Sequence, residues 1–221
     1  MDLKLTVNQG KGLSIVADRA MEGGICFAIT TQWAFILLRG ESYETEVTVG
    51  QTFRKQKGGG SFKAPITEDT SVTVQKGFFS LVALQRGYDL VDLKLADKMS
   101  AANQDSFFKV ASEFSEKYLK SLCRSNECSL KPMATYKTVA ELVPTLSFVS
   151  GTVDLIGIFG VEDGKNWGHI VGTGVMGKNK FFDANSGEWT SPDDGVRTDI
   201  IAYLNKYYAG IQNCARYTIT K

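Results

Sequence analysis

Residues 23–38 read GGICFAITTQWAFILL, and this stretch sets the organisation of the chain. Its apolar side chains recur at the spacing of one helix face, which carries Cys26, Ile29, Trp33, Ile36 and Leu37. Arg39 and Gly40 follow, a basic residue and a glycine of the kind that end a helix. We therefore predict a helix that begins at about Cys26, ends near Gly40 and carries a thiol at its N-terminus.

A thiol in this place is suited to act as a nucleophile. The first turn of a helix has unpaired backbone N–H groups and the positive end of the helix dipole, which both favour an anion such as a thiolate. Gly23 and Gly24 would let the backbone come close to a substrate carbonyl, and the backbone N–H of Cys26 would contribute to an oxyanion hole. The alternative is an ordinary buried cysteine at the start of a core helix.

The composition is that of a globular protein and argues against several classes of partner. The chain has 221 residues, of which 43% are hydrophobic and 22% charged, and a formal net charge of +1. This charge disfavours a globally basic nucleic-acid binder, so we expect no nucleic-acid partner. The N-terminus lacks the pattern of a cleavable signal peptide, and the longest apolar run, residues 33–38, is too short to span a bilayer. Contact with a membrane surface stays open, and no pattern indicates an oligomeric state.

The cysteines do not form a pattern typical of disulfides or of zinc. They stand at 26, 123, 128 and 214, and without a secretory signal a disulfide framework is not expected. Cys123 and Cys128 have neither a second cysteine pair nor more than one histidine to complete a zinc site. We therefore predict no metal and no cofactor.

The rest of the chain is helical first and extended later. Residues 101–122 keep a helical period that includes Phe107 and Phe108, and residues 77–98 favour a helix. Residues 3–16 alternate loosely, as in a short strand or an extended lead-in, and 54–61 form a basic, glycine-rich connection. Strands at 146–160, 167–176 and 180–183, joined by turns, predict an antiparallel meander, followed by a helix at 197–208 and a strand at 215–220.

This order predicts an α+β fold in one domain over residues 1–221. The helical portion covers about 20–125 and the sheet portion about 145–221.

Two residues of the predicted sheet complete a catalytic set with Cys26. His169, the only histidine, lies on the second strand of the meander, and Asp183 ends the third. Antiparallel pairing brings them close together if the turn between the strands centres near residue 176. Cys26 would then attack a carbonyl, His169 would take and return the proton, and Asp183 would orient the ring. Taken singly, a structural histidine and a turn aspartate are equally good interpretations.

Other side chains near these positions are secondary candidates. Asn185 rivals Asp183 as the group that orients the imidazole, and is otherwise a turn asparagine. Trp33 belongs to the core of the cysteine helix or lines a substrate groove. Trp167 and Trp189 flank His169 and Asp183, where they shield the hydrogen bond between them or simply pack.

Three short motifs also resemble a known family. They are GIC at 24–26 with Trp33 seven residues later, GH at 168–169, and FDANSGE at 182–188. They are similar to motifs of the YopT/AvrPphB-type cysteine proteases of bacterial effectors. In that family the third motif typically reads FFDPNxGE, and Ala184 stands here in place of the proline. Papain-like enzymes place a glutamine six residues before the cysteine, where this chain has Ala20, so the second oxyanion donor is unassigned between Asn8 and Gln9.

The resemblance implies a papain-like fold in which a helical part carrying the nucleophile packs on an antiparallel sheet carrying His and Asp. It assigns the nucleophile to Cys26, the base to His169 and the orienting acid to Asp183, with no cofactor. It further implies a protein substrate in a host cell, reached by a bacterial secretion machine that needs no cleavable signal. The site of action would be the host cytosol; otherwise the protein is cytoplasmic.

The first hypothesis is therefore a cysteine protease that acts on a host protein through a thioester acyl-enzyme. The same triad would also serve glutamine deamidation, transglutamination or peptidoglycan amide hydrolysis. A binding module without catalysis is the third reading. Acidic residues that would recognise a basic substrate, or simply face solvent, are Glu41, Glu44, Glu46, Glu162 and Asp163.

Overall fold

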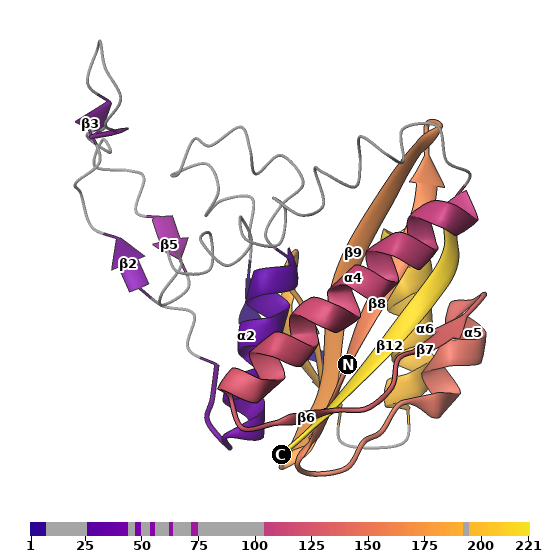
Figure 1. Ribbon diagram of the computed structural model, residues 1–221. Coiled ribbons are helices and arrows are strands. Elements are labelled where there is room, and N and C mark those ends of the chain that lie inside the picture. Colours follow the sequence, from indigo (N-terminus) through magenta and orange to yellow (C-terminus); the bar gives the residue numbers. More distant parts are fainter. Residues whose placement is uncertain are drawn as a thin grey trace.

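The computed structural model describes residues 1–7, 26–43, 47–49, 54–55, 62–63, 72–74, 104–191 and 195–221. Its centre is an eight-stranded sheet whose pairs are all antiparallel (Figure 1). The strands are β1 (Asp2–Thr6), β6 (Ser129–Leu130), β7 (Ala134–Tyr136), β8 (Thr152–Glu162), β9 (Lys165–Met176), β10 (Lys178–Asp183), β11 (Gly187–Ser191) and β12 (Ile211–Thr220). They follow the order β1-β11-β10-β9-β8-β12-β6, and β7 pairs with β12 as well.

Helices lie on both faces of this sheet (Figure 1). They are α2 (Cys26–Leu38), α4 (Gln104–Ser125), α5 (Val139–Leu142) and α6 (Val196–Tyr207), with a 3₁₀ turn, η2, at Val143–Thr145. α2 and α4 pack on one face, and α5 and α6 pack on the other. Two further short pairs join β2 (Val47–Val49) to β5 (Val72–Val74) and β3 (Arg54–Lys55) to β4 (Phe62–Lys63).

The central strands are buried on both faces because successive side chains point to opposite sides. On β8, Leu155 belongs to the core under α2 and α4, whereas Ile156 belongs to the core under α5 and α6. On β10, Phe182 stacks on Trp33 of α2, whereas Phe181 meets Tyr203 of α6. The strand that carries Asp183 is thus fixed from both sides.

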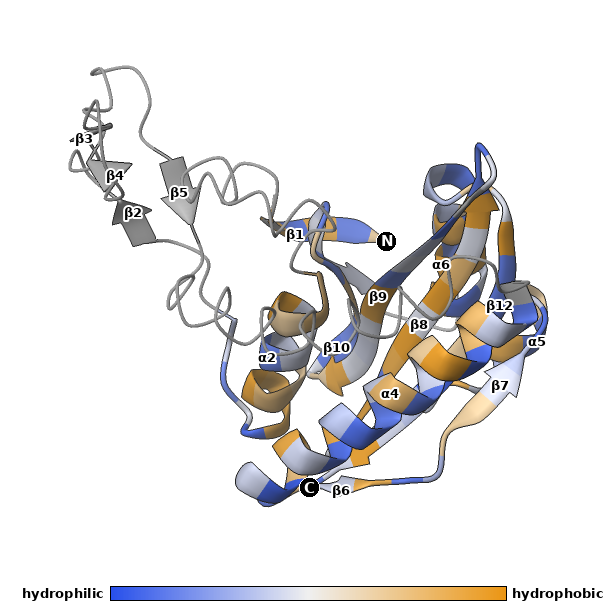
Figure 2. Cartoon of the chain, turned by 45° about the horizontal axis from the view of Figure 1, so that its top comes forward, coloured by the Kyte–Doolittle hydropathy of each residue, from blue (hydrophilic) through white to orange (hydrophobic). Residues whose placement is uncertain are grey.

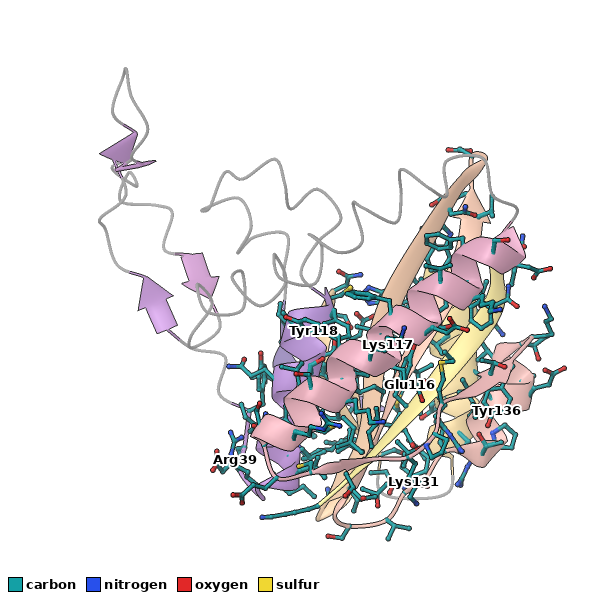
Figure 3. All side chains as sticks on the ribbon, viewed as in Figure 1. Arg39, Glu116, Lys117, Tyr118, Lys131 and Tyr136 are labelled. Carbon is teal, nitrogen blue, oxygen red and sulfur yellow. The ribbon has the colours of Figure 1, made fainter. Side chains whose placement is uncertain are left out.

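The helix α4 lies beside α2 and completes the layer over one face of the sheet. In Figure 2 blue and orange residues alternate along α4, as expected for a helix with one buried side. Tyr118, labelled in Figure 3, packs its ring edge-on against Phe27 of α2 with 5.7 Å between centroids. Glu116 accepts a hydrogen bond from the backbone N of Met133 at 2.8 Å, which ties α4 to the segment between β6 and β7. The contacts of α4 thereby hold α2 in place.

The predicted strands of the meander, the closing strand and the helices near 101–122 and 197–208 are confirmed, except that the first strand begins at Thr152 and not at 146. The sheet is wider than predicted, since β1, β6, β7 and β11 also belong to it. The helix predicted from Cys26 is confirmed, and it is buried on nearly all sides, with Ile36 one of its less buried residues. Its high apolar content is that of a core helix. The helix predicted at 77–98 lies outside the described residues.

Candidate active site

The N-terminal residue of α2 lies next to the histidine of β9. Cys26 is 9% exposed, and its side chain is hydrogen-bonded to the ring of His169. One helical turn further on, Thr30 donates a hydrogen bond from Oγ1 to the backbone carbonyl of Ile170 at 3.2 Å. Cys26 and Thr30 are four residues apart and share a helix face, so this bond places Cys26 beside His169, which precedes Ile170.

The contact between Cys26 and His169 is made past the end of β10. β10 ends at Asp183, which pairs with Val171, whereas β9 continues to Lys165. Among the described residues, the stretch 165–170 of β9 therefore pairs with β8 alone. At the unpaired edge of this stretch, the start of α2 meets the side chain of His169. α2 packs on one face of the sheet, whereas His169 lies on the other face together with Val171.

Asp183 has a full set of hydrogen bonds. The carboxylate is completely buried, and its Oδ1 lies 2.9 Å from His169 Nε2 and accepts from the backbone N of Asn185 at 2.8 Å. Oδ2 accepts from the hydroxyls of Tyr203 at 2.8 Å and Tyr208 at 2.6 Å. A buried carboxylate needs such partners to remain charged.

Tyr208 follows α6 and covers the histidine. Its ring stacks on the His169 imidazole with 4.9 Å between centroids and 20° between planes. Its hydroxyl also accepts a hydrogen bond from Asn185 Nδ2 at 3.0 Å. Trp167 packs on Tyr208 in turn, at 6.1 Å between centroids. Aromatic rings therefore form two layers over the histidine, whose side chain is 7% exposed.

The charges of the site support one another. Burial lowers the pKa of His169, but the charge of Cys26 and the hydrogen bonds to Asp183 and Cys26 outweigh it and raise the pKa to about 10. Burial raises the pKa of Asp183, but the hydrogen bond and charge of His169, with the hydrogen bonds from Tyr208 and from the backbone of Asn185, bring it below its ordinary value. Burial and the charge of Asp183 raise the pKa of Tyr208, which stays neutral. The site therefore favours a protonated imidazolium at His169 beside an ionised carboxylate at Asp183.

The structure brings the three predicted residues together by a slightly different register. The turn centres on Gly177, with Met176 opposite Lys178, and Asp183 lies opposite Val171. His169 is two residues further along the same face, so the carboxylate reaches it diagonally across the strands. Because Nε2 of His169 is bonded to Asp183, the other ring nitrogen, Nδ1, is the one that is left to bond with Cys26.

The secondary candidates take other places. Asn185 contacts Asp183 through its backbone and Tyr208 through its amide, and Asp183 holds His169 Nε2. Trp33 is fully buried, stacks on Phe182 and donates from Nε1 to Glu188 Oε2 at 2.8 Å. The suggestion that Trp33 lines a groove is therefore wrong, because a completely buried side chain in the core cannot contact a substrate.

Trp189 and the acidic candidates take no part in the hydrogen bond between His169 and Asp183. Trp189 packs on Tyr203 and donates to Ser186 Oγ at 3.2 Å, so it supports the tyrosine. Glu41, Glu162 and Asp163 are exposed. Gly23, Gly24, Ala20, Asn8, Gln9, Glu44 and Glu46 lie outside the described residues. Among the described residues, Cys26 is the first of α2.

The contacts of Tyr203 and Tyr208 with Asp183 were not predicted from the sequence. Both residues lie in or next to the helix that was predicted at 197–208, where tyrosines are ordinarily core residues. The usable signal was Asp183 itself, since a carboxylate expected in the core requires donors. Within the described part of the chain there is no group of three or more His, Cys, Asp or Glu that could hold a metal ion. None of the described helices is both long and apolar enough to cross a membrane.

No protein-family model and no curated protein matches this chain. The structure is similar to the crystal structure of the Pseudomonas avirulence protein AvrPphB, with a TM-score of 0.56. The alignment covers 92% of this chain and 95% of that chain, at 14% sequence identity. At this identity the likeness establishes a shared α+β fold with an antiparallel sheet and a few helices.

Proposed function

We propose that the protein is a cysteine peptidase of papain-like type, which cleaves a protein substrate through a thioester acyl-enzyme. Cys26 is the nucleophile, His169 the general base and acid, and Asp183 the orienting acid. The observation that carries the proposal is the hydrogen bond of the Cys26 side chain to His169, whose other ring nitrogen binds Asp183. Cys26 lies far earlier in the sequence than the two consecutive strands that carry His169 and Asp183, and a single histidine serves the set.

The arrangement supports each step of acyl transfer. The Cys26 thiolate attacks the scissile carbonyl carbon and forms the C–S bond, while the carbonyl oxygen becomes an oxyanion near the backbone N–H of Cys26. The imidazolium of His169 then gives its proton to the amine as the C–N bond breaks, which leaves a thioester. Water next attacks the thioester carbonyl, His169 takes the proton of that water, and the thiolate is restored beside the imidazolium as the C–S bond breaks and the acid product leaves.

Asp183 acts on His169 throughout this cycle. Its Oδ1 accepts the hydrogen bond of Nε2, which keeps the second ring nitrogen turned to the sulfur. Its charge also stabilises the imidazolium, the form that protonates the amine. An imidazolium beside the sulfur in turn favours the nucleophilic thiolate.

The resemblance of the three motifs and the likeness of the fold to AvrPphB support a bacterial effector that acts on a protein. We propose a substrate in a host cell, reached after secretion without a cleavable signal peptide. The chemistry requires no cofactor. Glutamine deamidation and amide hydrolysis of peptidoglycan use the same acyl transfer, and the experiment below separates deamidation from peptide cleavage.

The first test is selective alkylation, because the other thiols are poor nucleophiles. Burial, followed by the charge of Cys128, raises the pKa of Cys123 to about 11, and burial with the charge of Glu141 raises that of Cys214 to about 12. Iodoacetamide at neutral pH should label Cys26 first, and His169→Ala should slow this labelling. Labelling of all four cysteines at one slow rate would contradict an activated thiol.

The second test identifies the reaction. A eukaryotic cell lysate is treated with the wild type, with Cys26→Ala, and with Cys128→Ala as a matched control outside the site. New protein N-termini should appear with the wild type and with Cys128→Ala, and be missing with Cys26→Ala. Glutamine-to-glutamate conversion without new termini would overturn the assignment as a peptidase, and new termini with Cys26→Ala would overturn the role of Cys26.

A further inference from the structure

Both hydroxyls that bind the second oxygen of Asp183 come from the region of α6. Tyr203 and Tyr208 donate to Oδ2, so this oxygen has two donors and Oδ1 is the one that faces His169. The backbone N of Asn185 adds a donor to Oδ1. Two donors on one oxygen and two on the other fix both the plane and the rotation of the carboxylate.

Each hydroxyl ends a chain of hydrogen bonds that runs toward the carboxylate. Trp189 Nε1 donates to Ser186 Oγ at 3.2 Å, and Ser186 Oγ lies 2.6 Å from the hydroxyl of Tyr203, which donates to Asp183. In the other chain Asn185 Nδ2 donates to the hydroxyl of Tyr208, which again donates to Asp183. Asp183 sets the direction of both hydrogen-bond chains, because an ionised carboxylate can only accept hydrogen bonds. Donors arranged in sequence polarise one another and strengthen the final bond.

Among the described residues, the ion-pair partner of Asp183 is His169. The groups that face the His169 ring are Cys26 from α2, Asp183 from β10 and Tyr208 after α6. With no lysine or arginine in this set, neutral hydroxyls supply the remaining stabilisation of the buried charge. Tyr208 has a second part in the site, since its ring covers the imidazole that its hydroxyl indirectly orients.

We propose that Tyr203 and Tyr208 are positioning residues, which hold Asp183 charged and turned so that Oδ1 orients the imidazole of His169 toward Cys26. This inference rests on the proposed function. The hydroxyls of Tyr203 and Tyr208 are hydrogen-bonded to Asp183, and through Asp183 they act on His169. Their hydroxyls therefore govern the pH range in which the thiolate and imidazolium coexist, whereas their rings serve the packing of α6 on the sheet.

The variants Tyr203→Phe and Tyr208→Phe remove each hydroxyl and keep each ring. The matched control is Tyr207→Phe on the same helix, because the Tyr207 side chain is 57% exposed and packs on Tyr203 through its ring. Urea unfolding of each variant verifies that the fold is kept. If one of the two variants fails to fold, the other still removes a hydroxyl from the same oxygen.

The first measurement is the rate of Cys26 alkylation by iodoacetamide against pH. Loss of either hydroxyl should move the acidic limb of this profile to higher pH by about one to two units, since a hydrogen bond to a charged group is lost. Tyr207→Phe should keep the profile of the wild type. Profiles of Tyr203→Phe and Tyr208→Phe that coincide with that of Tyr207→Phe would overturn the proposal.

The second measurement does not depend on catalysis. The chain has one histidine, so the ¹⁵N and ¹³C resonances of a histidine-labelled sample report His169 alone. In the wild type the ring should stay protonated well above neutral pH, and each hydroxyl loss should lower the pH at which it titrates. If the wild-type thiol proves unreactive while these shifts appear, the proposed function fails and the positioning role stands. If the thiol is reactive and the histidine titration is unchanged by both variants, the positioning role fails alone.

Discussion

The indole of Trp33 occupies the space in which a side chain at residue 172 would lie. A Cβ built on Gly172 would be 2.6 Å from Trp33 Cζ3, closer than such atoms approach in proteins. The indole is in turn held by Phe182 and Glu188. The close approach of α2 to β9, on which the position of Cys26 depends, therefore requires a glycine at 172.

Gly172→Ala should push α2 away from β9 and separate Cys26 from His169. We expect a loss of about 1–3 kcal/mol in the free energy of unfolding and a slower alkylation of Cys26. Gly174→Ala on the same strand is the matched control, because its Cβ would meet the tip of the flexible Leu37 side chain, also at 2.6 Å. Urea unfolding and alkylation rates measure both effects, and equal losses in the two variants would contradict the argument.

Thr30→Val should loosen the register between α2 and β9. The variant keeps the shape of the side chain but removes the hydrogen bond from Oγ1 to the Ile170 carbonyl, which should cost about 1 kcal/mol and slow the alkylation of Cys26. Thr31→Val is its control, since Thr31 Oγ1 is buried without a hydrogen-bond partner among the described residues. That variant should be neutral or stabilising. A reversed order of the two variants in thermal unfolding would refute the anchoring role of Thr30.

Glu188 joins a buried ion pair to the cysteine helix. It accepts a hydrogen bond from Lys180 Nζ through Oε1 and one from Trp33 through Oε2. Glu188→Gln should destabilise the protein by about 3–5 kcal/mol, because it leaves the lysine buried without a counter-charge. The double variant Lys180→Met/Glu188→Gln should lose much less than the sum of the single losses. Additive losses in a double-mutant cycle would show that the two groups do not interact.

The stability of the protein should fall as the pH rises from 6.5 to 10. The folded state holds the proton of His169 up to about pH 10, against an ordinary pKa of 6.5. At this residue the folded chain holds a proton that the unfolded chain releases, so the contribution of His169 to stability is complete below 6.5 and is lost as the pH passes 10. The effect is on the order of a few kcal/mol. Urea unfolding at both pH values measures it, and His169→Gln should have a flatter dependence; parallel curves would contradict the assignment.

The meander could be predicted from the sequence because its strands are long, β-branched and separated by glycine turns. Leu155 and Ile156 illustrate why alternation was not visible there: both faces of β8 are buried, so the whole strand is apolar. Residues 187–191 were not predicted as a strand, since they are short and include a charged residue. Glu188 is tolerated on β11 because Lys180 and Trp33 pair with it, a relation between residues far apart in sequence.

Cys26, His169 and Asp183 could be proposed as a set from the sequence because each is a residue type with suitable chemistry in a characteristic local pattern. The tyrosines could not, because their role depends on where α6 ends relative to β10, which no local pattern encodes. The side-by-side position of β1 and β11 likewise joins the first residues of the chain to residues near 190. Such long-range contacts are set by packing of the whole domain rather than by propensity.

The enclosure of α2 couples the chemistry of the chain to its folding. A helix surrounded by core residues can exchange its amide protons only when the domain opens as a whole, so the thiol is carried by one of the last elements to meet solvent. The enhanced reactivity of Cys26 toward an electrophile should then fall to that of an ordinary cysteine in step with global denaturation, without an earlier phase in which an otherwise folded molecule has already lost it.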